Sequence, residues 1–279
     1  MSTTSTEVEE LIDSTVSIPT IPTVLNEINA VLASPDGSAK DAAGVIERDP
    51  AIATRALRLV NSSFYGLRNP VSNINLGCSI LGLQVISNLV VQATVLQTFQ
   101  TDTGSVLDAD WLWDHSFKAA VACRMLAERT ELGFDLSRDD AYTCGLVHDV
   151  GKLILLDSQP ERYADAVRVS AAQQTPLAHA ERLVFGFDHA HVGGVLARRW
   201  KLAQDVQDAV LFHHSQDTDA PRAAAGRLVQ AANSYAHLTS SREGGWRGDA
   251  LEHDALMALG LSEAAHLEIL QATAAAQGG

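Results

Sequence analysis

The stretch Gly145-Leu146-Val147-His148-Asp149-Val150-Gly151-Lys152 places an imidazole directly beside a carboxylate at the end of an apolar helical run. Neighbouring His and Asp side chains can together hold a divalent metal, since both are common metal ligands. A His-Asp pair also arises by chance, and a buried histidine is often held by hydrogen bonds alone. The pair therefore indicates either a metal centre or a hydrogen-bonded core, and the surrounding sequence has to separate the two.

The composition around this stretch predicts an all-α fold. The chain has 279 residues, of which 46% are hydrophobic and 19% charged, which is enough to bury a sizeable core. Apolar residues recur at helical spacing and no series of strands is evident. We expect a two-lobed helical bundle, with an N-terminal helical lobe (18–104) packed on a second helical lobe (105–238) and a linker at 101–105. Residues 1–17 would hold a flexible N-terminus and a first helix, and residues 239–279 a loop and C-terminal helices.

Charge, cysteines and hydropathy narrow the functional classes. A formal charge of −14 argues against general nucleic-acid binding, because such binding depends on clustered Lys and Arg. Cys78, Cys123 and Cys144 are widely spaced in apolar helical patterns, which predicts free thiols in a reducing compartment. No run approaches the roughly 20 apolar residues that span a bilayer. The N-terminus also lacks the pattern of a secretory signal, so we expect a cytoplasmic protein without a membrane role.

Local signals predict several helix boundaries. Ser34-Pro35-Asp36-Gly37 would end one helix, Ser38 would cap the next, and Pro50 would lie in the first turn of a third. The stretch from Val85 to Phe99 is apolar on all sides, which is typical of a buried helix. In the second lobe we expect helices over 111–132, 138–147, 161–172, 177–185, 189–200, 203–212 and 223–238.

Other histidines accompany His148-Asp149, each on a separate predicted helix. His115 lies in an early helix of the second lobe, His189 begins a later one, and His213-His214 ends another. Helices in a bundle can bring such residues to one cavity, as they do in di-metal bundle proteins. The candidate metal ligands are therefore His115, His148, Asp149, His189, His213 and His214.

Several unlinked motifs, in this order, resemble one family. They are Ile18-Pro19-Thr20-Ile21-Pro22, Arg48-Asp49-Pro50-Ala51-Ile52, Leu59-Val60-Asn61-Ser62, Cys78-Ser79-Ile80-Leu81-Gly82, His148-Asp149 with Gly151-Lys152, and Phe185-Gly186-Phe187-Asp188-His189 with Gly193, Trp200 and His213-His214. Together they resemble the HDOD family, the HD-related output domain of bacterial signalling, within the HD superfamily of metal-dependent phosphohydrolases. The resemblance runs from about Ile18 to about Leu238 and implies that the second lobe is HD-like. It also implies an output or interaction module that has lost hydrolytic competence.

Two departures from active HD enzymes support that implication. Asn233 stands at the closing position where those enzymes place a metal-binding aspartate, and its neutral amide offers one weaker oxygen and no charge. After His214, the segment 215–219 lacks both the glutamate and the Gly-Tyr-Pro signature of the cyclic-dinucleotide phosphodiesterase branch. The activity of that branch therefore cannot be transferred to this chain.

We accordingly expect a bacterial regulatory module that binds a signalling protein partner, with a nucleotide as the alternative ligand. The second hypothesis is a metal-dependent phosphohydrolase or phosphodiesterase acting on nucleotides or cyclic dinucleotides, in which Asp149 and Lys152 would be catalytic. Whether the chain is an enzyme stays open, with the balance against it. No cofactor is expected, and the alternative is a weakly bound divalent Fe, Mn, Zn or Ni ion on the histidines and Asp149, with Asn233 as a further ligand.

Overall fold

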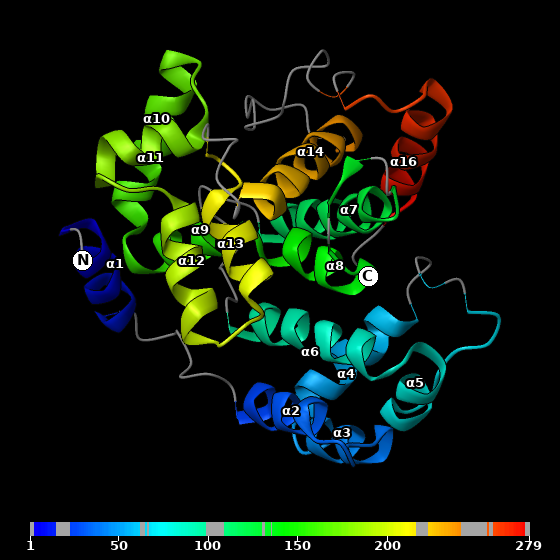
Figure 1. Ribbon diagram of the computed structural model, residues 1–279. Helices are drawn as coiled ribbons and strands as arrows, with labels where there is room; N and C mark the ends of the chain where they lie inside the picture. Colours follow the sequence, from blue (N-terminus) through cyan, green and yellow to red (C-terminus); the bar gives the residue numbers. More distant parts are fainter. Residues whose placement is uncertain are drawn as a thin grey trace. The chain divides into compact units, whose positions relative to one another are not determined.

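Helices make up the regular structure, and none of the residues that the structure describes forms a strand (Figure 1). This confirms the predicted all-α class. The computed structural model describes residues 3–14, 23–61, 65, 67–98, 109–129, 132–134, 136–215, 223–240, 256 and 259–276. The expected linker at 101–105 and the prolines at 19 and 22 lie outside these residues.

The chain forms two compact units, which confirms the predicted two-lobed bundle. The smaller unit is Ser17–Gln100, and the larger unit joins Met1–Val16 to Thr101–Ala276. The N-terminal segment therefore belongs to the larger unit, although the smaller one follows it in the sequence. No helix in the described part of the chain has the length and apolar character that crossing a membrane requires.

The smaller unit consists of helices whose apolar faces meet in one core. These are α2 (Thr23–Ala33), α3 (Ala39–Ile46), α4 (Pro50–Val60), α5 (Ile74–Leu81) and α6 (Leu83–Thr98). Helix α6 packs against α4, α2 and α5, and α3 packs against α5 and α2. The buried side chains of this core include Ile28, Ile46, Val60, Ile74, Ile86 and Leu89.

The predicted helix starts in this unit are confirmed. Ser38 caps α3 through a capping box, in which Ser38 Oγ accepts from the Asp41 N–H at 3.2 Å and Asp41 Oδ2 accepts from the Ser38 N–H at 3.1 Å. Pro50 is the first residue of α4, where its missing N–H would have no partner in any case. Both signals act within a few residues, which is why the sequence alone reveals them.

Asn61 links the end of α4 to the segment that leads into α5. Its Nδ2 donates to the carbonyl oxygens of Leu57 and Val71, each at 2.9 Å, and its Oδ1 accepts from the Val71 N–H at 2.7 Å. The Asn61 side chain thus hydrogen-bonds both the N–H and the C=O of Val71, in the segment that leads into α5.

We expect Asn61→Ala to lower the free energy of unfolding of the smaller unit by about 1–3 kcal/mol, because the Val71 backbone groups lose their partners. Urea denaturation of the full chain would measure the change. Asn75→Ala is the matched control, since Asn75 is exposed on α5, and its effect should stay within about 0.5 kcal/mol. Equal effects of the two substitutions would contradict the role given to Asn61.

The larger unit is built around α7, which lies against α8, α14 and α16 (Figure 1). Helix α13 packs on α12, α14 and α8, helix α9 packs on α12, and α1 packs on α12 and α9. Their bounds are α1 (Thr3–Ser14), α7 (Ala109–Ala127), α8 (Arg138–Val147), α9 (Val150–Ser158), α10 (Pro160–Gln173), α11 (Leu177–Phe185), α12 (His189–Arg199), α13 (Gln204–Phe212), α14 (Ala223–Thr239) and α16 (Glu263–Ala275). Large buried side chains of this unit include Phe117, Leu126, Leu153, Tyr163, Trp200 and Tyr235.

No helix was predicted over 150–158, and the structure has one there. Helix α9 occupies that stretch, with every residue from Val150 to Leu156 buried. A helix that is buried on all sides has no polar face, so its sequence lacks the amphipathic period on which the other predictions depended. Only His148 and Asp149 separate the end of α8 from the start of α9, so this pair forms the turn between the two helices.

The three cysteines are free and buried, as predicted. Burial raises the pKa of the Cys78 thiol to about 11, and it raises the pKa of Cys123 and Cys144 as well. Such thiols are poor nucleophiles and poor metal ligands, because both roles need the thiolate. The site chemistry therefore rests on histidines and carboxylates.

Candidate metal centre

His148 follows the last residue of α8 and is anchored to that helix by its own ring. Its Nδ1 lies 2.7 Å from the Gly145 carbonyl oxygen, which has no amide partner within the helix end. A carbonyl oxygen can only accept, so Nδ1 carries a proton. The Nε2 lone pair is then free to bind a metal.

His213 repeats this arrangement at the end of α13. Its Nδ1 donates to the Val210 carbonyl oxygen at 2.7 Å, with the same spacing of three residues. In both rings Nδ1 therefore donates to a carbonyl oxygen at a helix C-terminus, and Nε2 faces the interior. The sequence signal is a histidine directly after an apolar helix end.

His189, the first residue of α12, is held by a carboxylate instead. Glu181 Oε2 accepts from the His189 backbone N–H at 2.8 Å and lies 2.6 Å from His189 Nδ1. Both side chains are fully buried. Nε2 of His189 consequently faces Asp149 Oδ1 at 3.2 Å and His214 Nε2 at 2.9 Å.

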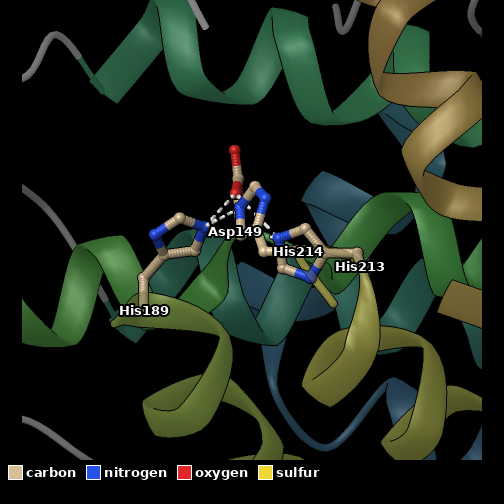
Figure 2. A group of neighbouring side chains, drawn as sticks. All are labelled: Asp149, His189, His213 and His214. Atoms are coloured by element: carbon tan, nitrogen blue, oxygen red, sulfur yellow. Dashed lines mark hydrogen bonds and ion pairs between the residues drawn. The ribbon is translucent and has the colours of Figure 1, made fainter. Parts of the chain in front are cut away.

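Figure 2 shows the rings of His189, His213 and His214 gathered around Asp149. Asp149, His189, His213 and His214 each offer a ligand atom within 4.8 Å of the others, and His115, His148 and Asp149 form a second such group. Asp149 belongs to both groups. The structure thus brings together six of the seven residues that the sequence singled out, and this buried cluster (His115, His148, Asp149, His189, His213 and His214) could bind a metal ion.

Asn233, the seventh candidate, lies on α14 with its side chain buried. Its Oδ1 has no hydrogen-bond partner among the described residues. Leaving a buried carbonyl oxygen unmatched costs about 1–3 kcal/mol, so the position is not explained by packing alone. No hydrogen bond or ion pair in the described part of the chain joins Asn233 to the buried cluster.

Lys152 and Glu181 balance the charges of the buried cluster. Lys152 Nζ donates to Asp149 Oδ2 at 2.7 Å. Burial alone would raise the pKa of Asp149, but His148 and Lys152 beside it hold that pKa well below the ordinary value. Burial would lower the pKa of His189, but the Glu181 carboxylate outweighs it and raises that pKa to about 10. Lys152 and His189 thus each lie against a carboxylate, those of Asp149 and Glu181.

The rings of His115, His213 and His214 are neutral. Burial lowers their pKa well below the ordinary value for histidine. Both ring nitrogens of His115 and Nε2 of His148 make no hydrogen bond that meets the geometric limits among the described residues, and Asp149 Oδ2 lies 3.6 Å from His115 Nε2 and 3.3 Å from His148 Nε2. Unprotonated imidazole nitrogens that are buried and unmatched fit a divalent transition metal, which takes such a lone pair without a proton. The donor set of the buried cluster therefore fits that kind of ion.

Sequence reasoning missed two residues next to the buried cluster. Glu181 was not singled out, although a glutamate on an apolar helix face is an unusual residue to bury. His237 was given no role, yet its ring centroid lies 4.5 Å from that of His115. Burial lowers the pKa of His237 to about 4, so this ring is neutral as well. For His237 the sequence carries no signal, because its spacing on α14 is that of an ordinary helix position.

Comparison with known proteins agrees with the fold and the motif order. The profile of the HDOD domain matches residues 18–216. An uncharacterized protein of Treponema pallidum is 27% identical over 198 residues, which are 71% of this chain. The aligned part spans only 38% of the length of that relative.

Solved structures share the fold over nearly the whole chain. An HDOD domain protein of unknown function from Geobacter sulfurreducens has a TM-score of 0.75 and 26% identity, and the match covers 96% of this chain and 88% of that one. A candidate signal transduction protein from Marinobacter aquaeolei has a TM-score of 0.74 and 19% identity, covering 96% and 62%. A candidate metal-dependent phosphohydrolase from Shewanella amazonensis has a TM-score of 0.63 and 23% identity, covering 97% and 99%. At these last two identities the likeness shows the fold alone.

Proposed function

Because the chain belongs to the HDOD family, we propose that it is a regulatory output module of bacterial signalling whose buried cluster binds a divalent transition metal without hydrolysing a substrate. The metal stabilises the larger unit, and a signalling protein is the binding partner of the module. One fold can host many functions, so the function has to be inferred from the residues of the site.

One observation carries the metal part of the proposal. Three rings, those of His148, His189 and His213, each have Nδ1 tied to an acceptor outside the buried cluster, which leaves Nε2 directed inward. Metal-binding histidines are typically held in this way by a carbonyl or a carboxylate, which fixes the tautomer and the ring orientation. Chance packing of buried histidines would not orient three rings alike.

The residues would divide between two neighbouring positions. His189, His213, His214 and Asp149 would hold one ion, and His115, His148 and Asp149 could hold a second. A divalent ion supplies a concentrated positive charge that can polarise a phosphoryl oxygen. Glu181 keeps His189 in place, and Lys152 keeps the Asp149 carboxylate ionised.

Two features argue against hydrolysis. Lys152 Nζ already forms an ion pair with Asp149 Oδ2. The negative charge of this one carboxylate is therefore partly neutralised before any metal ion binds. The closing position carries Asn233, which adds no negative charge. A weaker field of anionic ligands lowers the affinity for a hard divalent ion and limits what it can activate.

The hydrolase remains the second candidate, because the complete set of histidines surrounds Asp149 and because Lys152 could stabilise a phosphoryl oxygen. Two measurements distinguish the regulatory module from the hydrolase. The first is the metal content, by mass spectrometry, of protein purified without a metal-affinity tag. The second is turnover of bis(4-nitrophenyl) phosphate and nucleotides in Mn²⁺ or Fe²⁺. We expect bound metal and no turnover. If turnover occurs and His148→Ala abolishes it, the protein is the hydrolase instead. If the purified protein takes up no metal, the proposal that the buried cluster binds a metal is refuted.

Glu181→Gln should weaken metal binding about 10- to 100-fold, the usual effect of losing a carboxylate behind a histidine ligand. Glutamine can still accept one hydrogen bond, so the fold should persist and the negative charge alone is lost. Competition with a chromophoric chelator for Zn²⁺ would give the affinity. Glu161→Gln, at an exposed position in the first turn of α10, is the matched control and should change nothing. Unaltered affinity in Glu181→Gln would count against metal binding through His189.

Asn233→Asp should make the larger unit less stable without metal and more responsive to it. A buried carboxylate with no partner is costly, and a divalent ion at the closing position would provide that partner. Thermal unfolding with chelator and with Zn²⁺ would measure both effects, with Asn233→Ser as the neutral control. A melting temperature that falls in Asn233→Asp and does not recover with metal would place Asn233 away from the metal position.

A further inference from the structure

A cavity of about 520 Å³ lies within the larger unit, beside the buried cluster. Its walls come from α1, α11, α12 and the end of α13, and His214 contributes to both the cavity and the buried cluster. Cavities of roughly 300–1,000 Å³ are typical of small-molecule sites. We call this space the α1 cavity, because Val8 of α1 forms part of its wall.

One wall of the α1 cavity is cationic. Arg182 donates to Asp188, and Asp188 also lies 2.7 Å from His191 Nδ1, so that carboxylate is fully engaged. The guanidinium of Arg198, in the last turn of α12, has no ion pair or hydrogen bond among the described residues. The cavity therefore holds one more guanidinium than its carboxylate can neutralise, in a chain whose formal charge is −14.

The lining of the α1 cavity also includes the apolar side chains of Val8, Leu211 and Phe212. An anion without an organic part would leave these side chains exposed to water. A ligand that combines a phosphate with a planar or apolar body would use both the cationic and the apolar lining, because guanidinium groups bind phosphate through paired N–H donors and the body can contact Phe212.

We propose that the α1 cavity binds a small organic phosphate of the nucleoside monophosphate class, with the phosphate at Arg198 and Arg182 and the base against Phe212 and Leu211. The ligand would be the signal that the regulatory module senses, and in this respect the inference rests on the proposed function. Binding itself needs no metal, because the phosphate is met by arginines. A ligand in this cavity contacts α1 through Val8 and the buried cluster through His214.

Isothermal titration of the full chain with AMP, GMP, CMP and UMP tests the proposal, first with chelator and then with Zn²⁺. At least one nucleotide should bind with a Kd below about 1 mM, and Arg198→Gln should weaken it about tenfold or more. Leu211→Trp should also abolish binding, because the larger ring fills the cavity. Arg168→Gln is the charge-matched control, since Arg168 is exposed on α10 and pairs with Asp165 there.

The nucleoside of the tightest-binding nucleotide and inorganic phosphate complete the test. That nucleoside should bind at least tenfold more weakly than its monophosphate, and phosphate alone should also bind more weakly than the monophosphate. Failure of all four nucleotides, equal binding of the nucleoside or of phosphate and the monophosphate, or equal losses in Arg198→Gln and Arg168→Gln would each overturn the proposal. Nucleotide binding by protein that takes up no metal would leave this inference intact while refuting the metal part of the proposed function.

Discussion

Replacing Gly151 with alanine is expected to cost the larger unit about 3 kcal/mol or more, because α9 and α12 touch at this residue with no space for a methyl group. A Cβ atom on Gly151 would lie 2.0 Å from the His189 carbonyl oxygen and 2.8 Å from the Gly193 nitrogen. Both are backbone atoms, so no side-chain rotation can relieve the overlap. The helices must move apart or the unit must unfold.

Thermal unfolding should show this loss as a fall of roughly 6–12 °C in the melting temperature, since 1 kcal/mol corresponds to roughly 2–4 °C for a unit of this size. Gly44→Ala makes the same chemical change in α3 of the smaller unit, where no atom lies within 4 Å of the new Cβ. That control should be neutral or slightly stabilising, because alanine is the better helix former.

The same substitution should reach the buried cluster. The carbonyl oxygen that the new methyl would strike belongs to His189, whose ring faces Asp149. Any movement of α12 that relieves the overlap therefore displaces one ligand of the candidate metal position. We expect Zn²⁺ uptake by the folded fraction of Gly151→Ala to fall, and a variant that keeps both its stability and its metal content would contradict the close approach.

The histidine positions could be predicted from sequence because each has a local signal. His148 and His213 directly follow apolar helices, and His189 follows the helix-capping residue Asp188. Their convergence could not be derived from these signals. It depends on the packing of α12 against α9 and α13 and of α13 against α8, and α9 was the helix that the amphipathic period failed to reveal. The resemblance to the family supplied the convergence in its place.

Glu181 shows why the sequence leaves part of a site unseen. It lies eight residues before His189, on a different helix, and the bond between them exists only because the turn after α11 brings the start of α12 back to it. A glutamate on a helix is most often exposed, so no local pattern singles out Glu181. Residues that support a ligand are fixed by tertiary packing rather than by any local pattern.

Asp149→Asn is expected to have the second large effect, because Asp149 is the only carboxylate shared by both candidate metal groups. The substitution keeps the shape of the side chain and removes its charge. Lys152 then loses its ion pair with Asp149, and removing one member of a buried pair costs about 3–5 kcal/mol. Zn²⁺ uptake should be lost at the same time, since neither group keeps a charged ligand.

A double-mutant cycle with Lys152→Met separates these two effects. If the loss of stability comes from the broken ion pair with Lys152, Asp149→Asn should be less destabilising in the Lys152→Met background than alone, while Zn²⁺ uptake stays lost in both. Asp165→Asn is the matched control, because it removes one carboxylate from an exposed ion pair and should change stability by at most about 1 kcal/mol. An Asp149→Asn variant that matches this control in stability and still binds Zn²⁺ would show that the buried cluster does not depend on its one shared carboxylate.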